Sequence, residues 1–380
     1  MNYVVLDLEW NQGNSTMERR DEVMPFEVIE IGAVKLDENL SHISDFSRLV
    51  RPTRYHSLHF IAGKLLHITM EELASQQPFP EVCRDFLRWC GEDYVFVTWG
   101  PADLTELQRN MRWHGMGALS DGPIPFLDAQ KLYSLSHLER HERLSLETAV
   151  DQCGIRKDIQ FHRAFDDAYY TALILEKLPR SIFSYYSFDY FTLPKDKSAE
   201  VHVKFDTYAK YISRGFKDRH QALEDQTVMS TVCYLCGRVL KRHPVAWFTP
   251  NGKQYYCVSW CPEHGYMKAK VRLRKTDDGL VYVVKTERFI GEDDVNELRR
   301  RSLKQMKKER KTASMASIRK PDAVRRPDTL RKPDSLRKPD SLRKPDSFRN
   351  PGASRGSKPL CNAKKPKNLP NPKPSVNQQG

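Results

Sequence analysis

Acidic residues near the N-terminus have the type and spacing of a site for divalent cations. Asp7 and Glu9 lie two residues apart in the apolar run NYVVLDLEW. Residues two apart in a β-strand project from the same face, so both carboxylates would lie side by side. Such a pair resists ionisation unless a cation lies between its members. The spacing therefore predicts a metal site, although a solvated strand end explains this pair equally well.

Two further acids and a histidine extend this pattern. Asp103 follows Pro101 in the first turn of an expected helix, where a carboxylate can also act as a simple cap. Asp167 lies on a mainly apolar helical stripe, and periodicity does not exclude its neighbour Asp166. His162 lies about 140° around a helix from Asp167, which favours a place for it in the loop entering that helix. A surface histidine is the simplest interpretation of His162 alone.

Taken together, these residues resemble the DEDDh group of DnaQ-like 3′-to-5′ exonucleases, which have an RNase H-like fold. The first motif appears as Asp-Leu-Glu at residues 7–9. The second resembles WGPADL at residues 99–104. The third is similar to H-x-A-x-x-D, here HRAFDD at residues 162–167, and its spacing selects Asp167 over Asp166.

The resemblance covers about residues 1–180 and implies a metal-dependent 3′-to-5′ exonuclease that acts on single-stranded nucleic acid ends. Two Mg²⁺ or Mn²⁺ ions about 3.5–4 Å apart can stabilise the attacking and leaving oxygens of a phosphodiester. Hard cations prefer carboxylate oxygens. His162 would accept a proton from the attacking water. Trp10 is expected either to stack on the terminal base or to pack in the core. The implied metal ligands are Asp7, Glu9, Asp103 and Asp167.

Two other functions share parts of the pattern. One is a nucleic-acid or protein-binding adaptor with an inactive exonuclease-like domain, and the presence of every motif carboxylate together with His162 argues against it. The other is an RNase H-like endonuclease, which would not require His162. The run FHRAFDDAYYTA is similar to RNA-trimming members of the family and favours RNA over DNA, a choice that the residues themselves do not decide.

The elements that must position these residues follow from the hydrophobic pattern. Runs rich in β-branched residues predict strands, and apolar residues at helical spacing predict helices. The alternation favours an α/β domain with a mixed sheet that ends near residue 180, and the resemblance implies five strands. The expected strands are 2–8, 27–36, 43–50, 94–99 and a short one at 125–129; the expected helices are 60–67, 80–90, one from Pro101, 144–152 and 163–178.

A second cluster has the spacing of a zinc ribbon. Cys233 and Cys236 form one C-x-x-C-G unit, and Cys261 and His264 form a C-x-x-H-G unit 24 residues later. Two such turns can hold one tetrahedral Zn²⁺, and four protein ligands make the ion structural. Cys257 competes with His264 as a ligand through a C-x3-C spacing. Reduced cysteines without metal are the alternative for this small segment.

Residues 181–310 form an accessory region that contains this zinc-ribbon-like module at 231–292. A strand is expected at 199–205 and a helix from Thr207. Two further strands are joined by the turn Asp-Asp-Gly at 277–279. A basic helix is expected after the module, from residue 292 to 311. A basic run within the module suggests phosphate contact or a solvated strand: Lys268, Lys270, Arg272, Arg274 and Lys275.

The positive charge of the chain belongs to its C-terminal tail. The chain carries 62 Lys and Arg against 49 Asp and Glu, and residues 311–380 hold 18 of these basic and five of these acidic side chains. Subtraction leaves 44 of each in residues 1–310. Prolines every six residues from Pro321 and a thin apolar content predict that 311–380 are disordered. This tail would hold nucleic acid electrostatically or have no role.

Composition also limits the class of protein. The mean hydropathy is −0.65, and no apolar run approaches the roughly 20 residues that span a bilayer. The N-terminus lacks the apolar core of a signal peptide. We therefore expect a soluble cytoplasmic protein without membrane contact, whose eight cysteines are reduced or bound to metal.

Overall fold

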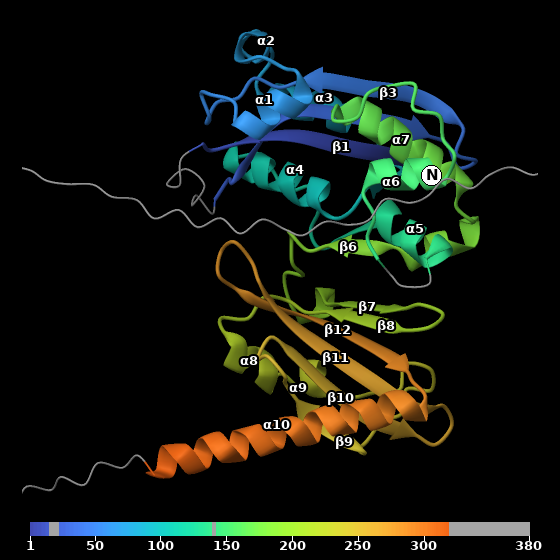
Figure 1. The fold of residues 1–380 in the computed structure, drawn as a ribbon, viewed down its shortest axis with the longest axis vertical. Helices are drawn as coiled ribbons and strands as arrows, with labels where there is room; N and C mark the ends of the chain where they lie inside the picture. The colour runs from blue at the N-terminus through green and yellow to red at the C-terminus, as the bar shows by residue number, and fades with distance from the viewer. Residues whose placement is uncertain (15–22, 139–141, 319–380) are drawn as a thin grey trace, which may run out of the picture. The chain divides into compact units, whose positions relative to one another are not determined.

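The computed structural model describes residues 1–14, 23–138 and 142–318, which belong to one compact unit containing two sheets (Figure 1). The first sheet is mixed, with the order β3-β2-β1-β4-β5-β6. Strands β1 to β3 pair antiparallel, β1, β4 and β5 pair parallel, and β6 pairs antiparallel with β5. The strands are β1 Asn2–Gln12, β2 Phe26–Leu36, β3 His42–Leu49, β4 Tyr94–Thr98, β5 Ile124–Asp128 and β6 Ser187–Asp189.

This sheet confirms the predicted α/β class and the predicted order of strands. Residues 1–180 contribute β1 to β5, and β6 adds a sixth strand from beyond the expected domain boundary at residue 180. Helices cover both faces of the sheet. They are α1 Phe60–Leu66, α2 Met70–Ala74, α3 Phe79–Cys90, α4 Ala102–Trp113, α5 Ala129–His137, α6 Leu146–Gln152 and α7 Ala164–Lys177.

The two faces follow from the alternation of side chains along β1. Val5 packs in a core with residues of α5, α6 and α7, whereas Val4 and Leu6 pack in a second core with residues of α3 and α4. The sequence pattern did not predict helix α5, because this helix follows β5 directly, without a turn residue between them. Asp128 ends the strand and caps the helix, and its side chain accepts the Lys131 N–H at 2.9 Å.

The second sheet is antiparallel, with the order β7-β8-β12-β11-β10-β9. The predicted hairpin across residues 277–279 is confirmed by β11 and β12. The helix predicted from Thr207 is wrong, because β8 lies there, paired between β7 and β12. The elements after residue 180 are η2 Arg180–Tyr185, η3 Lys197–Ala199, β7 Val201–Lys204, β8 Ala209–Ile212, α8 Arg219–Glu224, α9 Gln226–Met229, β9 Val245–Phe248, β10 Gln254–Cys261, β11 Gly265–Lys275, β12 Val281–Phe289 and α10 Glu292–Ile318.

The last helix extends beyond its expected end. Helix α10 runs to Ile318, so the predicted start of disorder at residue 311 is wrong for residues 311–318. The rest of the predicted disordered tail, 319–380, lies outside the described residues. Within the described residues, no helix is both long and apolar enough to cross a membrane.

Helix α7 meets the first sheet at a glycine. Gly32 on β2 is paired with Asp7 on β1. A Cβ atom at Gly32 would overlap the backbone of Ala164 and Phe165, which form the first turn of α7. The start of α7 therefore lies directly on the backbone of β2, beside the first predicted metal ligand.

Replacing Gly32 by alanine tests this close approach. We expect Gly32→Ala to lower the free energy of unfolding by about 1–3 kcal/mol or more, because backbone atoms cannot yield to the methyl group. Gly117→Ala is a matched control, since no atom lies within 4 Å of its added Cβ. Urea unfolding of both variants checks the prediction, and equal stability of the two would contradict it.

Candidate metal centres

Three of the predicted acidic ligands meet at the start of α7. Asp7 and Glu9 come from β1 and Asp167 comes from the first turn of α7. Each offers a carboxylate oxygen, and these oxygens all lie within 4.8 Å of one another. Because residues 7 and 9 share a face of β1 and α7 covers that face, the strand alternation brings both carboxylates under the helix.

The fourth predicted acid lies beside this group. Asp103, in the first turn of α4, is buried. The register between β1 and β4 runs from Asn2 to Val5. Beyond it, the backbone N–H of Leu8 donates to Oδ1 of Asp103 at 3.3 Å. Asp103 is therefore fixed against β1 next to Asp7, and it is not part of the group of three oxygens within 4.8 Å.

The electrostatics of the four carboxylates disfavour their ionised forms. Burial, followed by the charges of Asp103 and Glu9, raises the pKa of Asp7 well above its usual range. Burial and then the charge of Asp167 raise the pKa of Glu9 to about 8. Burial is also the main cause that raises the pKa of Asp103 to about 7 and that of Asp167 to about 6. One buried and three half-buried acids that repel one another fit a site for cations.

One oxygen of this cluster lacks a protein partner. Oδ1 of Asp167 is buried and has no hydrogen-bond partner among the described residues. A buried carboxylate oxygen without a donor is costly, and a divalent cation would satisfy it. Asp166 lies on the same turn of α7 but outside the group of three. The geometry thus agrees with the motif spacing, which selects Asp167.

His162 occupies the loop that enters α7, as the helical spacing predicts. It has a left-handed backbone with φ of 71°, and its side chain is exposed. It lies close enough to Asp167 to lower the pKa of that carboxyl, although burial outweighs this effect. The left-handed residue thus reverses the chain directly beside the acidic cluster.

Sequence reasoning missed the residues that anchor α7. Glu30 lies opposite Glu9 on β2 and is 1% exposed. Its Oε1 pairs with Nη2 of Arg163 at 2.8 Å, and its Oε2 accepts the backbone N–H of Ala164 at 3.4 Å. Glu30 is thus a fifth acid on this face, neutralised by Arg163. The alternation of side chains along β2 could have shown that Glu30 and Gly32 lie on one face of the sheet. The sequence does not show that the start of α7 packs on that face.

Trp10 makes core contacts. Its ring is half-buried and lies 5.5 Å, centroid to centroid, from Phe26. It also packs against the core formed with α3 and α4. These contacts support the packing of Trp10 in the core, and its stacking on a terminal base stays a prediction.

The second predicted cluster also assembles. Cys233, Cys236, Cys261 and His264 offer ligand atoms within 4.8 Å of one another. Nδ1 of His264 lies 3.5 Å from the sulfur atoms of both Cys233 and Cys261. Cys257 is buried on β10, paired with Ala269, and lies outside the group. The geometry therefore favours His264 over Cys257 as the fourth ligand.

The surroundings of this cluster suit a tetrahedral zinc ion. Gly237 and Gly265, which follow the two units, have left-handed φ values of 73° and 86°. Such turns bring two ligands of each unit together. Burial raises the pKa of Cys261, but hydrogen bonds from His264 and the backbone outweigh it and lower the pKa to about 6. This thiol is therefore readily deprotonated, as a metal ligand must be.

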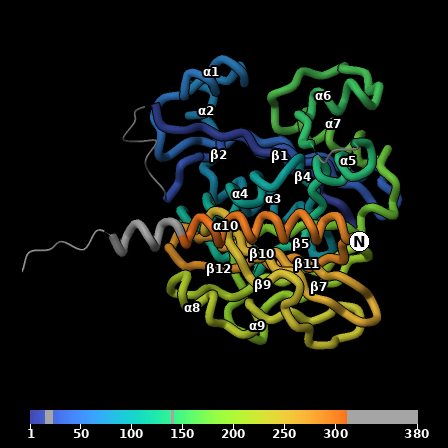
Figure 2. The backbone as a smooth tube through the Cα atoms, turned by 60° about the horizontal axis from the view of Figure 1, so that its bottom comes forward, coloured from blue at the N-terminus to red at the C-terminus, as the bar shows by residue number. Residues whose placement is uncertain are grey.

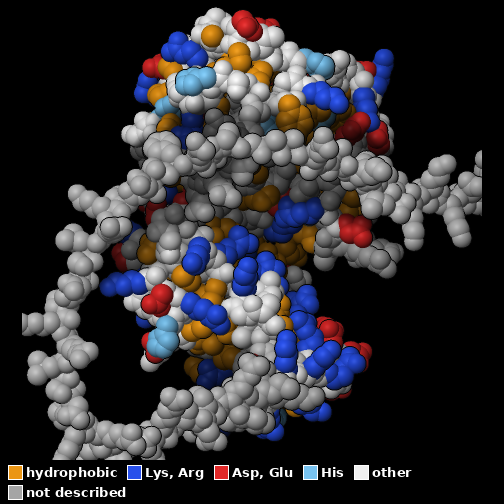
Figure 3. Space-filling model, turned by 60° about the vertical axis from the view of Figure 1, so that its left-hand side comes forward, with side chains coloured by type: hydrophobic (Ala, Val, Ile, Leu, Met, Phe, Trp, Pro, Cys, Tyr) orange, Lys and Arg blue, Asp and Glu red, His pale blue; other side chains and the backbone are white. Residues whose placement is uncertain are grey.

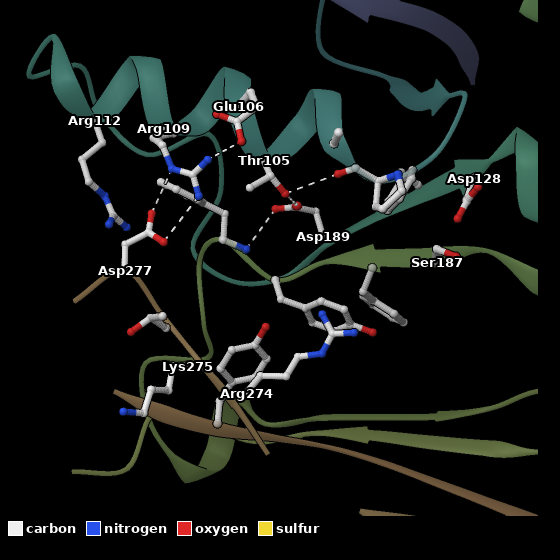
Figure 4. A pocket seen from close by; sticks show the side chains of 18 of the residues that line it. Thr105, Glu106, Arg109, Arg112, Asp128, Ser187, Asp189, Arg274, Lys275 and Asp277 are labelled. Atoms are coloured by element: carbon white, nitrogen blue, oxygen red, sulfur yellow. Dashed lines mark hydrogen bonds and ion pairs between the residues drawn. The ribbon is translucent and has the colours of Figure 1, made fainter. Parts of the chain in front are cut away.

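A polar cavity of about 440 Å³ lies between α4, β6 and the turn joining β11 to β12 (Figure 4). Arg109 points across it and pairs with Glu106 of its own helix and with Asp277 of the turn, the latter at 3.1 Å. Asp189 on β6 accepts hydrogen bonds from Thr105 and Gln108, both at 2.6 Å. These contacts connect the helix that carries Asp103 with the second sheet.

Comparison with known proteins agrees with this geometry. A sequence model of the exonuclease family RNase_T matches residues 4–175. The search of curated proteins gave no match. Among solved structures, the chain is similar to the nuclease domain of 3′hExo, a DEDDh family member bound to rAMP, with 19% identity over 46% of this chain and 90% of that chain and a TM-score of 0.41.

The chain is also similar to two further solved structures. Escherichia coli exonuclease I in complex with a dA16 oligonucleotide is 14% identical over 71% of this chain and 54% of that chain, with a TM-score of 0.39. Schizosaccharomyces pombe Pop2p in its Mg²⁺- and Mn²⁺-bound form is 14% identical over 46% of this chain and 81% of that chain, with a TM-score of 0.36. The match to the exonuclease family model RNase_T over residues 4–175 contains all three predicted motifs.

Proposed function

We propose that the chain is an active, metal-dependent 3′-to-5′ exonuclease of single-stranded nucleic acid. The observation that supports this proposal most directly is the convergence of Asp7, Glu9 and Asp167 within 4.8 Å, in a domain of the exonuclease family. An inactive adaptor would gain nothing from maintaining buried acids that repel one another. The raised pKa values of these acids favour metal binding over a purely structural role.

The carboxylates would hold two Mg²⁺ or Mn²⁺ ions, which when bound stabilise the attacking and leaving oxygens of the phosphodiester. Asp7, Glu9 and Asp167 would provide the closest ligands. Asp103 uses Oδ1 for the Leu8 N–H and would offer its other oxygen. The hydrogen bond from the Leu8 backbone N–H keeps the Asp103 carboxylate beside Asp7 against the repulsion of the other ionised acids.

The loop histidine would serve as the general base. The side chain of His162 is exposed and lies close enough to Asp167 to interact electrostatically with its carboxylate. A neutral imidazole accepts the proton of the attacking water, and the nearby carboxylate of Asp167 stabilises the imidazolium that forms. A strand end bound at the acidic cluster would present its terminal phosphodiester between His162 and the carboxylates. The exposed part of Trp10 stays a predicted contact for the terminal base.

Activity assays of point variants test the proposal. With Mg²⁺ or Mn²⁺ and end-labelled RNA or DNA of one sequence, we expect Asp7→Asn to reduce activity to background, because one metal ligand is lost. His162→Ala should slow turnover by about 10²–10⁴-fold. The control variants Asp121→Asn and His220→Ala alter exposed residues and should retain full activity.

The assay also separates an exonuclease from an endonuclease. A circular single strand offers no end and should survive, whereas the linear strand should shorten from its 3′ end. Cleavage of the circle, or full activity of Asp7→Asn, would remove the proposed mechanism. The rates of degradation of RNA and DNA of the same sequence show which of the two is the preferred substrate.

The pH dependence of stability tests the metal site without activity. Carboxyls with raised pKa values hold protons in the folded chain that the unfolded chain releases near pH 4. The metal-free protein should therefore lose stability as pH rises from about 4 through about 8. A bound cation keeps the carboxylates ionised, so the rise in melting temperature caused by Mg²⁺ should grow between about pH 6 and pH 8. A rise that is the same at both values, or that persists in Glu9→Gln, would contradict this.

Elemental analysis tests the zinc site. We expect about one equivalent of zinc in the purified chain, because four ligands complete one tetrahedral ion. Cys233→Ser should lose this zinc and lower the melting temperature. Cys257→Ser should keep it, since Cys257 lies outside the cluster. Zinc loss in Cys257→Ser alone would show that the ligand set is different.

A further inference from the structure

One face of the second sheet carries a stripe of basic side chains. On β11, Lys268, Lys270 and Arg272 alternate with buried residues that pack in the core on the opposite face. Lys268 is paired with Arg288 of β12, and Lys270 lies in register with Thr286, which is paired with Lys210 of β8. We call these five residues the basic stripe: Lys210, Lys268, Lys270, Arg272 and Arg288.

The stripe lacks the acidic partners that partly buried arginines have elsewhere in this chain. Arg163 pairs with Glu30 and Arg214 pairs with Glu200. By contrast, none of the five stripe residues forms an ion pair among the described residues. Asp294 and Glu297 of α10 act electrostatically on Lys268, and Asp128 acts on Lys210.

The stripe residues instead repel one another. Burial and then the charges of Arg272 and Lys268 lower the pKa of Lys270 to about 8. Burial, together with the charges of Lys131, Arg274 and Arg272, lowers the pKa of Lys210 to about 8. Cations that repel one another and form no ion pair among the described residues favour binding of an anion with several charges.

Aromatic side chains lie along the same surface. The Tyr256 ring on β10 lies 5.8 Å from Nζ of Lys268, 5.5 Å from Nζ of Lys270 and 5.3 Å from the guanidinium carbon of Arg301 on α10. At the other edge, Nζ of Lys210 lies 5.5 Å from the ring of Phe188. Both rings are buried, so they position the cations through cation–π contacts and are not platforms for base stacking.

The stripe is bordered on two sides. Val295 and Leu298 of α10 pack on Tyr256 and Val258 of β10, so α10 lies along that edge (Figure 2). Residues of β6, including Phe188, pack with β7 and β8 at the opposite edge. Figure 3 shows Lys and Arg side chains gathered over the part of the molecule that contains the second sheet and α10. The borders leave the β11 face as an elongated, positively charged surface.

We propose that the basic stripe binds the sugar–phosphate backbone of a single-stranded nucleic acid whose 3′ end lies in the exonuclease domain. The identity of the polymer rests on the proposed function. Alternate residues of β11 are about 6.7 Å apart, a separation comparable with that of successive phosphates in an extended strand. The chain's own tail is not a suitable occupant, because residues 311–380 carry 18 basic and five acidic side chains.

The stripe continues towards the exonuclease domain. Arg274 follows Arg272 on the same face of β11, and its guanidinium lies over the Tyr190 ring, 5.3 Å from its centre. Arg274 also lines the cavity whose wall includes Pro101, two residues before Asp103. A strand that leaves the acidic cluster past Pro101 would therefore meet Arg274 first and the basic stripe next.

The test compares two sets of variants of the full chain, each also carrying Asp7→Asn to prevent cleavage. The first set replaces Lys268, Lys270 and Arg272 by glutamine. The control set replaces the exposed residues Lys204, Lys217 and Lys241, which removes the same charge from the same region. Fluorescence anisotropy measures binding of single-stranded RNA and DNA of about 20 and about 4 nucleotides at several salt concentrations.

We expect the stripe variant to bind the longer strand at least about tenfold more weakly than the control at moderate salt. Its slope of log affinity against log salt should fall by about 2, since each phosphate contact contributes about 0.7. The short oligonucleotide should bind equally to both. The melting temperature of the stripe variant should not fall, because the replacement removes repulsion between like charges.

Equal weakening in both sets, or an unchanged salt slope in the stripe variant, would overturn the proposal. Polyglutamate that displaces the longer strand from the control, but does not bind the stripe variant, would instead identify a site for acidic peptides. Binding is measured independently of cleavage. A chain that binds the long strand through the stripe yet shows no nuclease activity would refute the proposed function and retain this inference.

Discussion

The structure depends on holding like charges together. Asp7, Glu9 and Asp167 come from two distant segments of the chain, and their burial makes every ionised form costly. The fold opposes this repulsion with contacts that do not involve the acids themselves. Arg163 neutralises Glu30 beneath the start of α7, and Gly32 lets that helix rest on the backbone of β2. The acids are thus fixed by the scaffold, and a cation is left to balance their charge.

The same scaffold connects the candidate active site with the second sheet. Helix α4 carries Asp103 in its first turn, and its later turns carry Arg109 and Arg112. These arginines pair with Asp277 and Asp278 in the turn between β11 and β12, at 3.1 Å and 3.4 Å. Strand β11 then carries the basic stripe away from this turn. One helix and one hairpin therefore join the acidic cluster to a surface of opposite charge, which is the arrangement that a polyanionic substrate with a reactive end requires.

Positive charge is concentrated in two parts of this chain, the C-terminal tail and the basic stripe. The tail accounts for the whole excess of 13 charges, whereas residues 1–310 have equal numbers of acidic and basic side chains. In the balanced part, the partly buried Arg163 and Arg214 have acidic partners, whereas the residues of the basic stripe form no ion pair among the described residues. The net charge therefore describes only the tail. In residues 1–310, acidic and basic side chains are equal in number but gather on different surfaces.

The sequence by itself determined the local elements and the motif residues. Period-two and period-3.6 patterns predicted five of the six strands of the first sheet and most of its helices. The C-x-x-C-G and C-x-x-H-G units predicted the second cluster. Local patterns failed where an element has no turn before it, as at α5, or where strand pairing decides, as at β8 after Thr207. Only the tertiary structure decided the roles of Glu30 and Gly32, the exclusion of Cys257 and the grouping of the basic stripe. Each of these depends on contacts between segments far apart in the chain, and such contacts leave no periodic signal in the residues themselves.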